Sequence, residues 1–541
     1  MCLIPSINYS IYWKISIVKR RRAIPLPHKC GSILAEIIMS LLGLDIGTTG
    51  CKAIAFSVDG KLLAHSYREY GEMYPRPGWA EIDPNKVWKC VSEVISDVAN
   101  QVSKSDPIKA LSVTTLGEAF TPIAEDGTIL SNSMTSVDNR AIEQTESWKH
   151  NLGMEKIFQI TGMSLHPSFS INKMMWLKKE QPEIFNKAKK LLLYQDFTYF
   201  KLGLEPTIDY SLASRTMAFD IRKKKWSDEI LSIAGIDPAL LATPRPSGEI
   251  VGEIPSSIAE KLGLPKGTVA VTGGHDQPVN ALGGGVVSEG VAVDGLGSVE
   301  CIIVGFNEPP LNEKMLNNNY PVYPHVKQGM YVSLAFSYTG GNLLRWYRNN
   351  FAQDMVQESQ KTGVDVYDLM LKDIPNDPTG IYVLPHFVGS GTPALDPDSK
   401  GVIAGLTLGT TREQFVKALI EGITYELRYY LTTLEDAANV KISRLRAMGG
   451  GAKSPMWLQL KADVTGKEVV ALAISECGCL GAAILAGVGV GEYNSVDEAV
   501  KILVKEKETY HPNPEMHRKY TETYGIYKEL YPTIKDLVHK M

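Results

Sequence analysis

The chain has 541 residues, enough for several domains or two large ones, and its 44% hydrophobic and 21% charged residues are ordinary for a globular protein. Its formal net charge of −4 leaves no basic excess for nucleic acid or an anionic membrane surface, so we expect neither partner. Seven scattered cysteines favour a reducing compartment, and we expect a cytoplasmic protein without membrane-spanning helices.

Residues 1–38 differ in pattern from the rest of the chain. Their short apolar stretch is split by Lys14 and is followed, not preceded, by the basic run 19–22, the reverse of a secretory signal. We therefore expect a disordered or mis-started leader, whose deletion leaves activity unchanged. A targeting or surface-anchoring segment is the alternative.

From Leu41 onward, apolar strand patterns alternate with longer amphipathic helices, which indicates an α/β fold. Residues 41–47 predict a buried strand that enters a glycine turn. Residues 52–60 predict a return strand that ends at Asp-Gly, and 61–65 continue it as a hairpin. This antiparallel order differs from a Rossmann unit, in which a helix follows the first strand.

A second set of the same elements begins near residue 290. Residues 290–298 predict a strand followed by a glycine and hydroxyl turn, and 299–304 predict the next strand. The chain therefore looks like a duplicated α/β unit, with Gly283-Gly284-Gly285 as a candidate hinge near the junction. Further on, apolar residues spaced four apart predict one helix over 411–438.

The first glycine turn, residues 45–50, has a composition suited to binding an anion. Its glycines let backbone N–H groups converge, and the hydroxyls of Thr48 and Thr49 can add hydrogen bonds. Asp45, at the strand end, could hold a magnesium ion through water, because Mg²⁺ favours carboxylates and keeps several waters. A plain hairpin turn is the alternative for this segment on its own.

Asp276 follows the apolar strand 268–271 and the pair Gly273-Gly274. A carboxylate at a strand end among glycines is accessible to a ligand, which suits a general base. The alternative is an aspartate that caps the following helix, although such a cap needs no glycine pair before it.

A third glycine segment, 448–454, lies between the predicted strand 444–447 and the predicted helix 457–464. Its glycines would let the backbone lie flat against a planar base or an α-phosphate, and the helix N-terminus favours negative charge. Alone this run is weak evidence.

Three such turns with two strand-end aspartates describe a nucleotide phosphate site with magnesium and a base. Walker A, protein-kinase and nucleophile-elbow motifs are absent from the sequence.

These segments, in this order, resemble the FGGY carbohydrate kinases of the actin-like ATPase superfamily, over essentially residue 41 to about 531. The motifs that carry the resemblance are Leu44–Thr49, Pro77–Pro84, Gly273–Asp276, Gly297-Ser298, Tyr338–Gly341, Leu384–Gly401, Glu421-Gly422, Gly449–Ala452, Trp457 and Ala462-Asp463. Each is modest evidence alone. Their joint order and spacing carry the assignment.

The resemblance implies an α/β fold of duplicated actin-like ATPase (ribonuclease H-like) domains with an interdomain cleft that closes over ATP and a sugar. We place the N-terminal domain, with the sugar site and the catalytic base, at 39–284. The C-terminal, ATP-binding domain is placed at 285–541. Phosphoryl transfer needs positioned phosphates, a bridging metal ion and a base, so ATP and Mg²⁺ are the implied cofactors.

The resemblance also implies roles for single residues. Asp276 matches the base that takes the proton from the attacking hydroxyl, and Asp45 matches the aspartate associated with magnesium. Thr48 and Thr49 would lie by the β- and γ-phosphates. The other residues of the implied ATP site match a Gly-Thr pair that faces the phosphates and a segment that lines the adenosine, and are Gly297, Ser298, Gly450, Gly451 and Ala452.

The substrate pocket departs from the known subgroups. Where xylulose kinases carry Gln-Met-His-Gly and glycerol kinases an Arg-Glu pair, this chain has Leu-Gly-Glu-Ala-Phe-Thr, and the Trp and Asn of the family's Trp-Asn-Asp-x-Arg segment are missing. Glu118, Asp138 and Arg140 can still hold sugar hydroxyls, or they form a structural ion pair. Trp79 can cover the apolar face of a sugar or pack in the core.

We expect an ATP-dependent, xylulose kinase-like enzyme that phosphorylates a hydroxyl of a small ketose, such as a pentulose, or of a polyol. The alternatives are an actin-like ATPase switch or scaffold and a degenerate kinase that acts as a sugar sensor. The Gly-Gly-His-Asp segment and the loop 79–84 favour the kinase, because a pure ATPase needs no sugar-binding loop. The retained Asp45 and Asp276 argue against a sensor, and a homodimer stays open.

Overall fold

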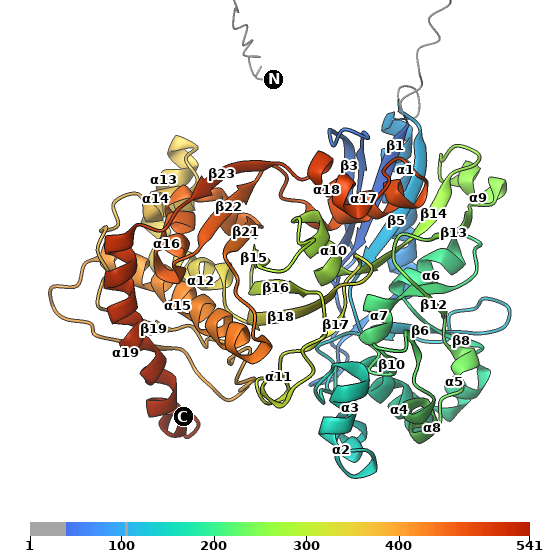
Figure 1. The fold of residues 1–541 in the computed structure, drawn as a ribbon, viewed down its shortest axis with the longest axis horizontal. Helices are drawn as coiled ribbons and strands as arrows, with labels where there is room; N and C mark the ends of the chain where they lie inside the picture. The colour runs from blue at the N-terminus through green and yellow to red at the C-terminus, as the bar shows by residue number, and fades with distance from the viewer. Residues whose placement is uncertain (1–38, 103–105) are drawn as a thin grey trace, which may run out of the picture. The chain divides into compact units, whose positions relative to one another are not determined.

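The computed structural model describes residues 39–102 and 106–541, so the leader predicted at 1–38 lies outside the described residues. Two large sheets organise this part of the chain (Figure 1). The first has the order β13-β14-β5-β1-β2-β3. Its strands are β1 (Ser40–Ile46), β2 (Gly50–Phe56), β3 (Leu62–Glu69), β5 (Ile108–Thr115), β13 (Ile250–Glu253) and β14 (Val269–His275). β1 and β2 pair antiparallel around the first glycine turn, and β2 and β3 form the predicted hairpin.

The second sheet has the order β17-β18-β16-β15-β21-β22-β23. Its strands are β15 (Val291–Leu296), β16 (Glu300–Phe306), β17 (Tyr323–Pro324), β18 (Tyr331–Ser337), β21 (Arg444–Met448), β22 (Glu468–Leu472) and β23 (Glu506–Tyr510). Apart from β17, the strands repeat the first sheet in order and direction: β15, β21 and β22 are parallel, as are β1, β5 and β14, and antiparallel strands flank them on both sides. The predicted duplication is therefore confirmed.

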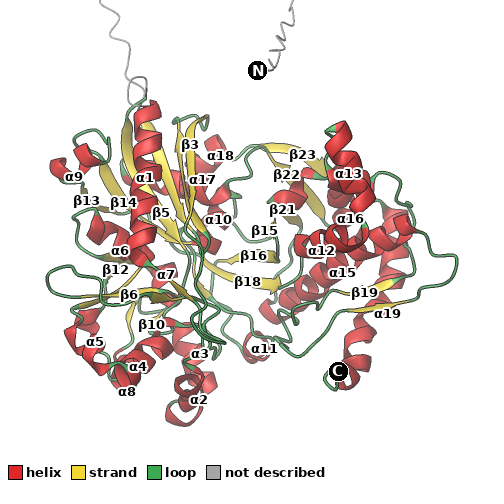
Figure 2. Ribbon diagram, turned by 180° about the vertical axis from the view of Figure 1, so that it is seen from behind, coloured by secondary structure: helices red, strands yellow, loops and turns green. Residues whose placement is uncertain are grey.

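The two faces of β1 are buried by different helices. Leu42, Leu44 and Ile46 belong to the core that includes one side of α1 (Pro84–Val102), while Leu41 packs with α17 (Cys477–Gly489). This split follows from the period of two along a strand. Figure 2 shows α1 in front of the first sheet, and Figure 1, from the opposite side, shows α17 and α18 (Val496–Leu503) in front of it.

α17 is apolar on all sides because it is surrounded by protein, and Cys477 to Gly487 are all buried. It packs against the first sheet although it follows β22 of the second sheet. Its other neighbour is α10 (Asp276–Gly283), which follows β14 and also contacts β15 and β16. α10 and α17 thus link the two halves of the duplication.

Long helices cover the outer face of the second sheet. α15 (Arg412–Ala438) begins one residue after the predicted start because Thr411 is its N-cap, in a capping box with Gln414. It packs with α16 (Pro455–Thr465) and with the C-terminal α19 (Pro514–Val538). None of the helices in the described ranges is both long enough and apolar enough to cross a bilayer.

Smaller elements fill the connections. Those between β5 and β14 include β6 (Phe120–Ile123), α2 (Ile142–Asn151), α3 (Met154–Thr161), α4 (Ser170–Glu180), α6 (Tyr194–Lys201), α7 (Tyr210–Ser214) and α8 (Asp228–Ala234). Those between β18 and α15 include α12 (Gly341–Phe351), α13 (Gln353–Thr362), α14 (Val366–Leu371), β19 (Tyr382–Leu384) and β20 (Val402–Ala404).

Candidate active site

The first glycine turn joins β1 to β2, and its carbonyl groups are occupied by the protein. The Gly47 N–H donates to the Gly50 carbonyl over 2.9 Å, and the buried Tyr70 hydroxyl donates to the carbonyls of both glycines. The Tyr70 N–H donates to the Thr49 carbonyl over 3.0 Å. In the described chain the hydroxyls of Thr48 and Thr49 carry no hydrogen bond to protein, so the turn retains its donors for an anion.

The second turn, between β15 and β16, repeats this arrangement at the surface. Its carbonyls accept from the start of α12: Gly341 N–H donates to Gly297 over 2.9 Å, and Asn342 N–H donates to Ser298 over 3.1 Å. The Gly297 N–H bonds within the turn to Val299, 3.0 Å away. Gly297 and Ser298 are both exposed, which leaves the serine hydroxyl accessible to a ligand.

The third glycine segment packs against the end of β15, beside the second turn. A Cβ on Gly449 would lie 2.5 Å from the Leu296 carbonyl oxygen, and one on Gly451 would lie 2.0 Å from Leu296 Cδ2. Gly449 also has a φ of 84°, which favours glycine. A short 3₁₀ turn, Gly450–Lys453, then leads into α16. Two of the three predicted turns are therefore neighbours in space.

Asp45 and Asp276 both lie at the carboxyl edge of the first sheet. Asp45 is next to last in β1, and Asp276 directly follows β14; these strands are parallel to β5, which lies between them. His275, not Asp276, is the N-cap of α10, so the capping alternative does not apply. The Asp276 side chain is 30% exposed, and its Oδ1 has no hydrogen-bond partner among the described residues, although His275 Nε2 lies 3.1 Å away.

Burial, together with the negative charges of Asp45 and Glu118, raises the pKa of Asp276 to about 7, although the Arg215 charge acts in the opposite direction. The pKa of Asp45 is raised to about 6, mainly by burial. Burial, with the Arg215 charge, holds the pKa of His275 well below its usual range, so this imidazole is neutral. A partly exposed carboxylate that titrates near neutrality suits general base catalysis.

The surroundings of Asp45 suit a hard cation. A Cβ on Gly478 would lie 3.0 Å from Asp45 Oδ2 and 3.3 Å from Asn280 Oδ1, so two oxygen atoms border the space that this glycine leaves. Oxygen donors are the ligands Mg²⁺ prefers, and it commonly takes one or two from the protein and the rest from water and phosphate. The described residues contain no cluster of three or more His, Cys, Asp or Glu side chains able to hold a metal ion.

Glu118 is held by a partner that the sequence reasoning missed. The Arg215 guanidinium donates to Glu118 Oε1 through Nε, over 2.6 Å, and through Nη2. Glu118 has a φ of 64°, a left-handed conformation that is uncommon for a non-glycine residue. The adjacent Gly117 leaves room for His275, whose Nε2 would lie 2.9 Å from a Cβ there. Glu118 and Arg215 therefore lie beside Asp276.

Asp138 and Arg140 pair with each other, as in the structural alternative. Arg140 donates to the fully buried Asp138 from Nε, over 2.9 Å, and from Nη2, over 2.7 Å, and its Nη2 also donates to Glu81 over 2.8 Å. The Arg140 guanidinium lies 3.6 Å from the centre of the Trp79 ring, and Trp176 packs edge-on against the same indole at 5.5 Å. Trp79 is thus half-buried against protein.

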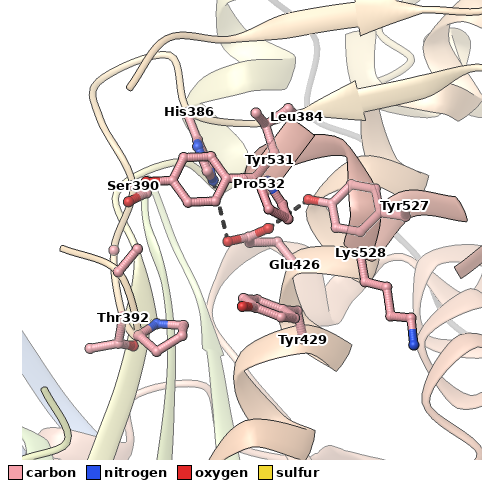
Figure 3. A pocket seen from close by; sticks show the side chains of 13 residues that line it. Leu384, His386, Ser390, Thr392, Glu426, Tyr429, Tyr527, Lys528, Tyr531 and Pro532 are labelled. Atoms are coloured by element: carbon pink, nitrogen blue, oxygen red, sulfur yellow. Dashed lines mark hydrogen bonds and ion pairs between the residues drawn. The ribbon is translucent and has the colours of Figure 1, made fainter. Parts of the chain in front are cut away.

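A cavity of about 20 Å³ lies apart from these residues, between α15, α19 and the loop after β19, and has room for about one water molecule (Figure 3). The buried Glu426 lines this cavity. Tyr527 donates to its carboxylate over 2.6 Å, and His386 Nε2 lies 3.4 Å from it. His386 Nδ1 lies 2.7 Å from the Ser399 hydroxyl. These contacts hold α19 against α15 and the loop after β19.

Comparison with known proteins agrees with this geometry. The model of the N-terminal domain of the FGGY family of carbohydrate kinases matches residues 40–283, and that of the C-terminal domain matches residues 295–490. The chain belongs to this family. It is therefore a carbohydrate kinase with a two-domain fold, an enzyme that uses ATP to phosphorylate a sugar or polyol, as predicted.

Individual relatives match nearly the whole chain. It is 27% identical over 501 residues to a xylulose kinase of Bacillus subtilis (strain 168), which covers 92% of this chain and 97% of the relative. A gluconokinase of the same strain is 29% identical over 501 residues, 91% of this chain and 95% of the relative. A solved xylulose kinase from Rhodospirillum rubrum is 25% identical, with a TM-score of 0.82 over 92% of this chain and all of that one.

Proposed function

We propose that this kinase transfers the γ-phosphoryl group of Mg-ATP to a hydroxyl of a neutral ketose or polyol, with Asp276 as the general base. The observation that carries the proposal is the 30% exposed carboxylate of Asp276, at the sheet edge that also holds Asp45. The substrate hydroxyl gives its proton to Asp276 while its oxygen forms a bond to the γ-phosphorus. The bond from that phosphorus to the β–γ bridging oxygen breaks, and ADP leaves.

The neighbours of Asp276 prepare it for this step. Neutral His275 lies against the carboxylate, and its Nδ1 is 3.3 Å from the Tyr323 hydroxyl, so the ring is held in place without supplying a charge that would weaken the base. The raised pKa makes Asp276 a stronger proton acceptor than an exposed aspartate, while it remains largely ionised just above neutrality.

We propose that the two domains, 39–284 and 285–541, bind sugar and nucleotide respectively. Thr49 and Ser298 are exposed and Thr48 is half-buried, which supports contacts of their hydroxyls with the phosphates. The remaining proposed nucleotide contacts are Gly297 at the phosphates and Gly450, Gly451 and Ala452 along the adenosine. Asp45, next to Asn280, would hold Mg²⁺, which neutralises charge on the β- and γ-phosphates when bound.

The charges near Glu118 and Asp138 favour a neutral substrate over an acidic sugar. Arg140 is paired with two carboxylates and Arg215 with one, and Lys173 donates to the Thr135 carbonyl over 2.6 Å. An aldonate carboxylate would therefore meet no uncommitted cation among these three. We propose that the second oxygen of Glu118 accepts a sugar hydroxyl, with Trp79 and Arg140 bordering the substrate and the buried Asp138 holding Arg140 in place.

We also propose a cytoplasmic location. The five cysteines in the described ranges, Cys51, Cys90, Cys301, Cys477 and Cys479, are free thiols, which agrees with a reducing compartment. A homodimer stays a prediction.

The test is Mg-ATP-dependent ADP release across a panel of ketoses, polyols and gluconate, with Asp276→Asn as the control. We expect a neutral ketose or polyol to raise the rate far above the background without sugar, in the wild type only. Stimulation by gluconate alone would overturn the proposed substrate class. Stimulation that persists in Asp276→Asn would overturn the role of the base.

A further inference from the structure

Three charged side chains lie completely inside the second half of the chain. Lys461 of α16 donates to Glu300 Oε1 over 2.7 Å and to Asp294 Oδ2, and these residues are 1%, 0% and 0% exposed. The Tyr430 hydroxyl donates to the other Glu300 oxygen over 3.1 Å. Asp294 Oδ1 is buried with no hydrogen-bond partner in the described chain. We call Lys461, Asp294 and Glu300 the buried triad.

The positions of the triad relate it to the glycine turns. Asp294 lies on β15 before the second turn and Glu300 begins β16 after it, so the two carboxylates bracket Gly297 and Ser298. Lys461 lies on α16, the helix that follows the third glycine segment. One ammonium group therefore joins both strands of the proposed phosphate turn to the helix after the proposed adenosine segment.

Stability alone does not account for this arrangement. Burying charges costs solvation free energy, and replacing a buried ion triad by uncharged side chains of similar shape is often neutral or stabilising. This triad also sets two carboxyl groups against one ammonium, although burial raises the pKa of Glu300 to about 7, and it leaves one oxygen unsatisfied. Charged hydrogen bonds are directional, so they fix the position of α16 relative to β15. Apolar contacts between these two elements would not fix it in this way.

We propose that Lys461 is a positioning residue, which through Asp294 and Glu300 fixes the phosphate turn at the separation from the adenosine segment that a nucleotide requires. This inference rests on the proposed nucleotide site. At that junction β15 also pairs with β21, which leads into the adenosine segment, and Leu296 packs against Gly449 and Gly451; the triad adds α16 to this connection. Loss of the triad should therefore weaken nucleotide binding and leave sugar binding, in the first half, unchanged.

The decisive variant is the triple substitution Asp294→Asn, Glu300→Gln and Lys461→Met, which removes all three charges while keeping the side-chain shapes. Lys461→Met alone would leave two buried carboxylates without their cation and is expected to destabilise the fold. The matched control is Lys417→Met with Glu421→Gln, a buried ion pair 3.4 Å apart on α15 that contacts neither turn.

The measurements are thermal unfolding, calorimetric binding of Mg-ADP and the separate KM values for ATP and sugar. We expect the triple variant to fold, to bind Mg-ADP at least about tenfold more weakly, and to raise the KM for ATP but not for sugar. A folded triple variant with wild-type nucleotide affinity would overturn the inference, as would an equal loss in the Lys417/Glu421 control. If the wild type itself fails to bind Mg-ADP, the proposed nucleotide site is wrong and the inference falls with it. If the triple variant does not fold, the triad is structural and the inference is wrong.

Discussion

Gly283 of α10 and Gly481 of α17 meet backbone to backbone where the two helices cross. A Cβ on Gly283 would lie 2.9 Å from the Gly481 nitrogen and 1.9 Å from the Cys477 carbonyl oxygen, and a Cβ on Gly481 would lie 2.2 Å from the Val279 carbonyl oxygen. Backbone atoms cannot yield as a flexible side chain can. The link between the two halves therefore depends on the absence of side chains at this crossing.

Gly283→Ala should consequently destabilise the protein by about 1–3 kcal/mol, because the helices must separate to admit the methyl group. The measurement is the free energy of unfolding in denaturant. Gly525→Ala is the matched control, since Gly525 lies inside α19 with no atom within 4 Å of an added Cβ. There the same substitution should stabilise by about 0.4–1 kcal/mol. Equal effects at both sites would contradict the close crossing.

Asp276→Asn should reduce kcat by about 10²–10⁴-fold, because the amide cannot accept the substrate proton, and should leave nucleotide binding nearly intact. Steady-state kinetics and calorimetric binding of Mg-ADP check the two parts. A variant that loses affinity for Mg-ADP as well would show that Asp276 serves the nucleotide and not the base function.

The pH dependence of kcat/KM should report the same carboxylate. Asp276 acts in its ionised form and its pKa is raised to about 7, so kcat/KM should be constant above that pH and fall about tenfold per pH unit well below it. Glu118→Gln removes a negative charge that raises this pKa and releases Arg215, which lowers it; both changes should move the acid limb to lower pH. An acid limb that moves to higher pH in this variant would contradict the assignment.

Removal of magnesium by a chelator should abolish phosphoryl transfer, and added Mg²⁺ should restore it. Asp45→Asn should raise the Mg²⁺ concentration required for half-maximal rate by about tenfold or more, because a neutral amide is a weaker ligand than a carboxylate. The KM for sugar is the internal control and should stay within about twofold of the wild type. An unchanged Mg²⁺ requirement in Asp45→Asn would remove this residue from the metal site.

We expect substitutions of Glu118 and Asp138 to have different effects, the first on sugar binding and the second on the stability of the fold. Glu118→Gln should mainly raise the KM for sugar, since one oxygen of this side chain is free of its Arg215 partner. Asp138→Asn should instead lower stability by about 3–5 kcal/mol, because it breaks a buried pair with Arg140. Thermal unfolding and the KM for sugar, measured on both variants, test this. A loss of stability in Glu118→Gln with a raised KM for sugar in Asp138→Asn would contradict both assignments.

The two strand–turn–strand units and the 411–438 helix were predictable because local periodicity and turn composition determine them. Asp276 at a strand end was predictable for the same reason, since its glycine pair is adjacent. The pairing of Glu118 with Arg215 was not predictable, because 97 residues separate them and the sequence around an isolated arginine does not indicate which carboxylate it binds. Lys461 lies 167 residues from Asp294, and an isolated lysine in a helix pattern indicates a solvated face rather than a buried one.

The packing of α17 on the first sheet has a consequence for synthesis of the chain. When β14 leaves the ribosome, every strand of the first sheet exists, yet the face that carries Leu41, Ile54 and Val271 still lacks its cover. That cover is encoded more than two hundred residues later, after β22. The nascent N-terminal half therefore exposes these apolar side chains until α17 has been synthesised, and we expect the N-terminal half made without α17 to aggregate more readily than the full chain.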